Sequence, residues 1–171
     1  RIYRARWRRY VVPLQRIIWN TDGLVELRLT RFFLNSSKKG ALSMKLFVYG
    51  TLLREESNHQ VLNGATLLYS GGLLQAKMYD TGNGYPAIEL AEGSTIVGDI
   101  YEIPDHMWID LDELEGHTGN STTDLYSKEI VKVQTVDGLI EAVVYTICDE
   151  SMKVNEILSG DWKAYRQSRH K

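Results

Sequence analysis

Short runs of β-branched, aromatic and aliphatic residues, separated by glycine-containing turns, occupy most of the chain after Met44. Runs of this length and composition are typical of strands, and Asp137-Gly138 between the last two is a clear hairpin signal. Because only two or three segments suggest helices, the pattern predicts an α+β domain with a mixed, barrel-like β-sheet and a few flanking helices. The expected strands lie at residues 45–49, 66–69, 72–79, 87–90, 95–103, 127–135 and 139–147, with turns at 71–72, 81–84 and 136–138.

Charge is divided unevenly along the chain. Residues 1–43 carry ten Lys and Arg against two Asp and Glu, a net charge of +8, whereas residues 44–171 carry a net charge of −10. The first segment begins with Arg rather than Met, and we interpret it as a basic N-terminal extension, either untranslated-region sequence read in frame or a cloning remnant. An organelle transit segment and a phosphate-binding arm are the alternatives. The polar cluster at 35–40 predicts a linker, which places the functional domain at 44–171.

Composition excludes several classes of protein. No apolar run approaches the roughly 20 residues that cross a bilayer, so we expect a soluble protein with no membrane partner. Cys148 is the single cysteine and forms no internal disulfide, and no Cys or His pair has the spacing of a zinc site. We therefore expect a cytoplasmic protein with no metal and no cofactor.

Residues 105–115 predict a helix, with Asp105 as the N-cap and Gly116 as the residue that ends it. At about 100° per residue, the apolar residues of this segment gather on one side of the helix. That buried stripe comprises Met107, Trp108, Leu111 and Leu114.

Glu115 falls within this stripe, between Leu111 and Trp108 on the helical wheel. Burial and the partial negative charge of the helix C-terminus both disfavour an ionised carboxylate there, so both raise its pKa. Such a group exchanges protons near neutral pH, which is the behaviour of a general base that later acts as an acid. The alternatives are that the last turn frays and Glu115 reaches water, or that it caps a backbone amide.

A second candidate element is the turn Tyr49-Gly50-Thr51-Leu52, which follows the first strand and precedes a polar segment at 54–62 that we expect to be helical. Glycine permits a tight turn whose successive N–H groups converge on one point, an arrangement suited to a carboxylate or a developing oxyanion. A simple strand exit, with Tyr49 as a core tyrosine, is the alternative.

Several separated elements together resemble one family. Residues 44–171 resemble the gamma-glutamylcyclotransferase-like proteins at 47–52, Asn58, 84–87, 97–101, 111–116, Tyr126, 142–145 and 159–162. The resemblance implies a barrel-like mixed sheet, and it implies that the Tyr49-Gly50-Thr51-Leu52 turn binds a gamma-glutamyl group through its backbone. It also implies that Glu115 is the catalytic acid and base. Our own hypothesis adds that Tyr49 and Tyr126 border the pocket.

The expected reaction is an intramolecular aminolysis, in which the α-amine of a small gamma-glutamyl compound attacks its own γ-carbonyl to give 5-oxoproline and a free amine or amino acid. The alternative is a non-catalytic binder of a small gamma-glutamyl or amino-acid-like metabolite. A nucleic-acid or membrane-surface module ranks last, because the net charge of −10 on residues 44–171 repels phosphate. The sequence defines neither the leaving group nor the oligomeric state.

Overall fold

The computed structural model describes residues 44–119 and 124–169. Residues 1–43, 120–123 and 170–171 lie outside the described residues, and the expected basic extension and its linker fall among them.

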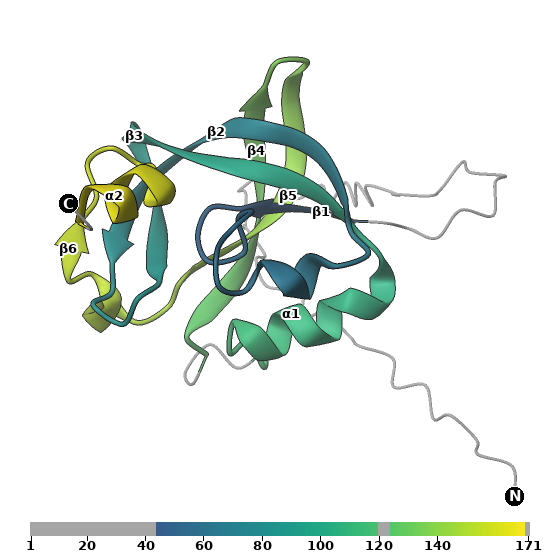
Figure 1. Ribbon diagram of the computed structural model, residues 1–171, viewed down its shortest axis with the longest axis horizontal. Coiled ribbons are helices and arrows are strands. Elements are labelled where there is room, and N and C mark those ends of the chain that lie inside the picture. The colour runs from purple at the N-terminus through teal and green to yellow at the C-terminus, as the bar shows by residue number, and fades with distance from the viewer. Residues whose placement is uncertain (1–43, 120–123, 170–171) are drawn as a thin grey trace, which may run out of the picture. The chain divides into compact units, whose positions relative to one another are not determined.

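The described chain forms one mixed sheet that closes on itself (Figure 1). The strand order is β3-β1-β5-β4-β2-β6, and an additional pairing of β2 with β3 closes the ring. β1 runs parallel to β5, and the other pairs are antiparallel. The predicted α+β fold with a barrel-like sheet is thereby confirmed. The strands are β1 (Met44–Val48), β2 (Thr66–Asp80), β3 (Pro86–Ile103), β4 (Tyr126–Thr135), β5 (Gly138–Ile147) and β6 (Asn155–Glu156).

In two places, a pair of expected strands forms one long strand in the structure: β2 joins the first pair and β3 joins the second. The turn expected at Gly71-Gly72 is wrong, because β2 continues through both glycines with a shift of register between Tyr69 and Gly72. Gly71 has a φ of 73°, and its N–H donates to Asp99 Oδ1 at 3.1 Å, so the glycines form a bulge rather than a turn. In β3 the expected gap after Leu90 is likewise an irregularity within a single strand.

The helical segments are shorter than expected. They are η1 (His59–Leu62), η2 (Asp105–Met107), α1 (Trp108–Leu114), η3 (Glu150–Met152) and α2 (Trp162–Arg169). A helix over 54–62 is wrong, since Glu55 has a φ of 67° and only the last four residues of that segment form a 3₁₀ turn. Asp105 is not an N-cap, because the chain is still extended at Pro104 and Asp105 already belongs to the 3₁₀ turn that precedes α1.

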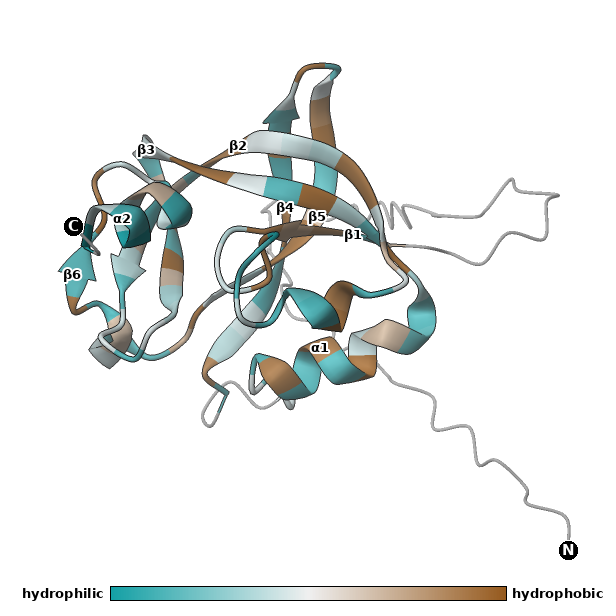
Figure 2. Ribbon diagram, viewed as in Figure 1, coloured by the Kyte–Doolittle hydropathy of each residue, from teal (hydrophilic) through white to brown (hydrophobic). Residues whose placement is uncertain are grey.

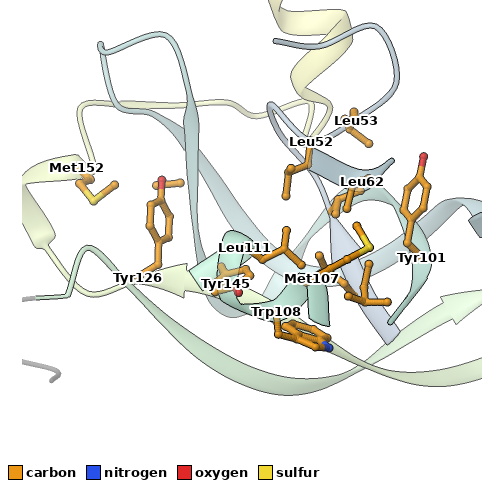
Figure 3. Close-up of a cluster of buried hydrophobic side chains, with 14 residues drawn as sticks. Leu52, Leu53, Leu62, Tyr101, Met107, Trp108, Leu111, Tyr126, Tyr145 and Met152 are labelled. Carbon is orange, nitrogen blue, oxygen red and sulfur yellow. The ribbon is translucent and has the colours of Figure 1, made fainter. Parts of the chain in front are cut away.

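Two apolar clusters form the core. One fills the barrel around Phe47, Ile100 and Trp162. The other lies between the barrel and α1, where Met107, Trp108 and Leu111 pack as the helical wheel predicts (Figure 3). Leu114 was expected to be buried with them, but it is 39% exposed, because α1 ends there and leaves its side chain at the edge of the packed surface. Figure 2 shows apolar and polar residues alternating along α1, as expected for a helix with one buried side.

Candidate active site

A cavity of about 420 Å³ opens where the end of β1, the loop after it, the loop before β3 and the end of α1 meet. All six residues that the sequence singles out for a site line this cavity, although they come from three distant parts of the chain: Tyr49, Gly50, Thr51, Leu52, Glu115 and Tyr126. The structure therefore brings the whole candidate set together. The other lining residues are Phe47, Val48, Ser57, Asn58, Asn83, Gly84, Tyr85, Pro86, Leu114, Leu125 and Tyr145.

The turn after β1 is held by hydrogen bonds to its carbonyl groups. The carbonyl oxygen of Gly50 accepts from Leu53 N at 3.0 Å, and that of Thr51 accepts from Asn58 N at 3.0 Å. His59 Nδ1 donates to the Leu52 carbonyl at 2.9 Å, and Asn58 Nδ2 donates to Thr51 Oγ1 at 3.1 Å. The N–H groups of Gly50, Thr51 and Leu52 donate no hydrogen bond to another described residue, so they remain available to a ligand.

Glycine is required at position 50 by a close approach of the opposite wall. A Cβ atom at Gly50 would lie 2.6 Å from Pro86 Cγ, well inside van der Waals contact. The turn after β1 and the first residue of β3 therefore touch directly at one edge of the cavity. This contact was not visible in the sequence, since the two residues lie far apart along the chain.

Glu115 occupies the C-cap of α1, and its N–H donates to the Leu111 carbonyl at 3.0 Å. The last turn is thus intact, which argues against fraying. The side chain is partly buried and lines the cavity, and no described residue is recorded as a hydrogen-bond or ion-pair partner of its carboxylate. Burial raises the pKa of Glu115 from 4.5 to about 7, the direction expected from the helical wheel.

Three tyrosines surround Glu115. The hydroxyl of Tyr49 donates to the Tyr145 carbonyl at 2.8 Å, and that of Tyr126 donates to the Pro86 carbonyl at 3.1 Å. Burial is the largest cause that raises the pKa of Tyr49, Tyr126 and Tyr145, and the charge of Glu115 adds a smaller contribution to each. For Tyr145, the hydrogen bond to Asp112 and the charge of that carboxylate raise the pKa more than Glu115 does. These phenols are therefore neutral at physiological pH, and their hydroxyl hydrogens fix the walls of the cavity.

The residues that hold Tyr145 in place are not among the candidates that the sequence identifies. The Tyr145 hydroxyl donates to Asp112 Oδ1 at 2.6 Å, and Lys128 Nζ donates to Asp112 Oδ2 at 2.7 Å. The one available signal was the position of Asp112 beside the buried stripe of α1. Asp112 and Lys128 thus fix Tyr145, whose carbonyl in turn holds Tyr49.

The raised pKa of Glu115 has a consequence for stability. Between its unfolded pKa of about 4.5 and its folded value of about 7, the folded state binds more protons than the unfolded state. Stability is therefore lost as the pH rises through this window. Relative to the wild type, E115Q should gain about 1–3 kcal/mol in free energy of unfolding between pH 5 and pH 8. Urea titrations of both proteins at the two pH values measure this difference, and parallel pH dependences would contradict it.

Comparison with known proteins decides the family. The family model for gamma-glutamyl cyclotransferase, AIG2-like, matches residues 46–164. The chain belongs to this family. The match begins after residue 43 and includes every residue of the candidate site.

Relatives in this cyclotransferase family cover most of the chain. A gamma-L-glutamyl-butirosin B gamma-glutamyl cyclotransferase from Niallia circulans is 35% identical over 75% of this chain and 81% of its own length. The gamma-glutamylcyclotransferase family protein YtfP of Escherichia coli K12 is 29% identical over 70% of this chain and 96% of its own.

Solved structures share the fold. YkqA from Bacillus subtilis is 27% identical to this chain, with a TM-score of 0.62. The match covers 76% of this chain and only 44% of YkqA. An AIG2-like protein from Mus musculus is 22% identical with a TM-score of 0.60, covering 70% of this chain and 88% of its own. The barrel described above is therefore the cyclotransferase fold.

Two features are absent from residues 44–119 and 124–169. No helix in these ranges is both long and apolar enough to cross a bilayer. No group of three or more His, Cys, Asp or Glu side chains within them is placed to hold a metal ion.

Proposed function

We propose that this member of the cyclotransferase family converts a gamma-glutamyl compound into 5-oxoproline and a free amine by intramolecular aminolysis. One observation carries the proposal: a carboxyl group whose pKa is about 7 shares a cavity with the turn after β1. The substrate carries its own nucleophile. The protein therefore needs only to fold the substrate into the ring-closing conformation and to move protons.

Glu115 moves the protons. Its carboxylate accepts a proton from the substrate α-ammonium, and the free amine attacks the γ-carbonyl carbon, so that a C–N bond forms and closes a five-membered ring. The protonated Glu115 then donates to the departing nitrogen as the original amide bond breaks, and the second proton of the attacking nitrogen passes through the regenerated carboxylate to the released amine. A pKa near 7 suits both steps, because neither protonation state is strongly favoured at neutral pH.

The turn after β1 supplies the complementary electrostatics. The N–H groups of Gly50, Thr51 and Leu52 bind the glutamyl carboxylate or stabilise the oxyanion that develops on the γ-carbonyl. Both functions use donors that are fixed before the substrate arrives. Tyr49 and Tyr126, whose hydroxyls are held by backbone carbonyls, border the same pocket.

The charge of the cavity indicates which leaving groups fit. Among its described lining residues, Glu115 is the only Asp, Glu, Lys or Arg. A leaving amino acid carries a carboxylate next to the scissile nitrogen, which Glu115 repels and no lining cation neutralises. We therefore propose that amines without an adjacent carboxylate are the preferred leaving groups.

A matched pair of substrates tests both parts of this function. Gamma-glutamyl-ethylamine and gamma-glutamyl-alanine differ by one carboxylate at the leaving group. We expect 5-oxoproline from both, with kcat/KM about tenfold higher for the ethylamine, equivalent to roughly 1.4 kcal/mol of repulsion. Chromatographic detection of 5-oxoproline gives both values.

The outcomes separate the hypotheses. Equal kcat/KM values would refute the leaving-group preference but would still support the proposed cyclotransferase activity. Stoichiometric binding of both compounds without any 5-oxoproline would refute the cyclotransferase and favour the binder of small gamma-glutamyl metabolites.

A further inference from the structure

The C-terminal helix α2 is fixed to the barrel at its start. Trp162 is only 2% exposed and belongs to the cluster inside the barrel. Just before it, the Gly160 carbonyl accepts from Val97 N at 2.9 Å, and a Cβ atom at Gly160 would collide with the Thr95 carbonyl oxygen. The helix is therefore seated on β3, on the side of the barrel where β6 lies (Figure 1). The remainder of α2 projects three cationic side chains from this base: Lys163, Arg166 and Arg169.

Arg169 contacts Asp80, the last residue of β2, which directly precedes the loop at 81–85 that forms one wall of the active cavity. Its guanidinium lies 2.6 Å from Asp80 Oδ2, and the Tyr165 hydroxyl donates to the same oxygen at 2.7 Å. The other oxygen, Asp80 Oδ1, accepts from Gly82 N at 2.9 Å and so shapes the loop at 81–85. Asp80 is 4% exposed, so its charge depends on these partners. Burial raises the pKa of Asp80, but the bonds from Gly82 and Tyr165 and the charge of Arg169 lower it further, to below its ordinary value.

The loop at 81–85 is a thin partition. Asn83, Gly84 and Tyr85 line the active cavity on one side. On the other side, a second cavity of about 470 Å³ lies against α2, and Gly84 lines this cavity as well. Within the partition, the Thr81 hydroxyl donates to the Tyr85 carbonyl at 2.7 Å, and Tyr85 packs against the core cluster at α1. The hydrogen bonds at Asp80 tie the Gly82 side of this loop to α2.

Arg166 contacts the opposite wall. It forms an ion pair with Glu56, whose side chain is 8% exposed. Glu56 belongs to the loop that continues the turn after β1: its N–H donates to the Leu53 carbonyl at 3.1 Å, and its own carbonyl accepts from His59 N at 3.2 Å. A buried carboxylate that loses its cationic partner is strongly disfavoured, so this loop too depends on α2.

We infer that α2 is a clamp that sets the distance between the two walls of the active cavity, with Arg169 and Arg166 as its positioning residues. One helix, seated on the barrel, holds the glutamyl-binding turn through Glu56 and the opposite loop through Asp80. Gly50 already touches Pro86, the residue of β3 that directly follows the loop at 81–85, so a shift of either loop changes the shape of the pocket. The kinetic consequence rests on the proposed cyclotransferase function, whereas the structural consequence does not.

The clamp is tested first without any substrate, by amide hydrogen exchange on the full chain. In R169Q we expect exchange at Gly82 and Asn83 to accelerate at least tenfold, with β4 and β5 unchanged. In R166Q the acceleration should fall on the loop around Glu56 instead. The matched control is K163Q on the same helix, since its partner Glu55 is 85% exposed and a surface pair of this kind contributes little. Uniform acceleration over the whole barrel in R169Q, or no change at Gly82, would overturn the clamp.

Kinetics with gamma-glutamyl-ethylamine provide the second readout. R169Q and R166Q should lower kcat/KM about 10- to 100-fold, because misplacing a pocket wall by about 1 Å has an effect of this size. The inflection of the pH profile should stay where it is, since neither arginine contacts Glu115, and R169K should restore part of the loss. Unchanged kcat/KM in both variants would overturn the positioning role. If the wild type itself forms no 5-oxoproline, the proposed function fails, while hydrogen exchange still decides on the clamp.

Discussion

Replacing Glu115 by Gln is expected to lower kcat for 5-oxoproline formation about 10²- to 10⁴-fold, the usual contribution of a positioned general acid and base. Glutamine keeps the size and shape of the side chain at the C-cap of α1 but neither accepts a proton from the substrate ammonium nor returns one to the leaving nitrogen. Substrate binding, which we propose uses the turn after β1, should change little. The loss therefore falls on kcat rather than on KM.

The control for E115Q is E113Q, two residues earlier on the same helix. Glu113 is exposed and does not line the cavity, so its substitution should leave kcat within about twofold of the wild type, as is usual for surface positions. The pH profile adds a second criterion. Wild-type kcat/KM should fall as the pH drops below about 7, when Glu115 becomes protonated, and this inflection should be absent from the residual activity of E115Q. An E115Q protein that turns over normally refutes the mechanism.

Glu115 and the turn at 49–52 could be predicted from the sequence because both depend on local rules. Helical periodicity alone turned Glu115 toward the buried side, and glycine after a strand indicated a tight turn. Their meeting in one cavity depends on closure of the barrel, which places the end of β1 beside the end of α1. Periodicity carries no information about such a distance. The resemblance to the cyclotransferase family supplied that link.

The support of the site was not predictable in the same way. Asp80, Glu56 and Arg169 are charged residues in polar surroundings, and their sequence positions resemble ordinary surface positions. Only the fold buries the two carboxylates and places α2 over both. The sequence predicts a turn at Gly71-Gly72 where the structure has a bulge, because a pair of glycines permits either and the pairing of β2 with β3 decides between them.

The second prediction with a large effect concerns closure of the barrel: Gly98→Ala in β3 is expected to lower the free energy of unfolding. A Cβ atom at this position would collide with the Val48 carbonyl oxygen and lie 2.6 Å from Phe47 Cζ. Backbone is the least yielding kind of neighbour, so we expect destabilisation at the upper end of the range for overpacking, about 3 kcal/mol. For a domain of this size, that corresponds to a decrease in Tm of roughly 10 °C.

Gly72→Ala is the matched control, because Gly72 pairs with Gly98 across β2 and β3. Its Cβ atom would meet a side-chain methyl group, Val133 Cγ1 at 2.9 Å, which yields more easily than a carbonyl group, so we expect a cost of about 1 kcal/mol. Val48 is the last residue of β1 and directly precedes Tyr49, so Gly98→Ala should also move the turn after β1 and lower kcat/KM below that of Gly72→Ala. Thermal unfolding and kinetics of both variants measure these differences. Equal Tm values would show that β1 shifts at little cost, and the rigid link between barrel closure and the site would then be wrong.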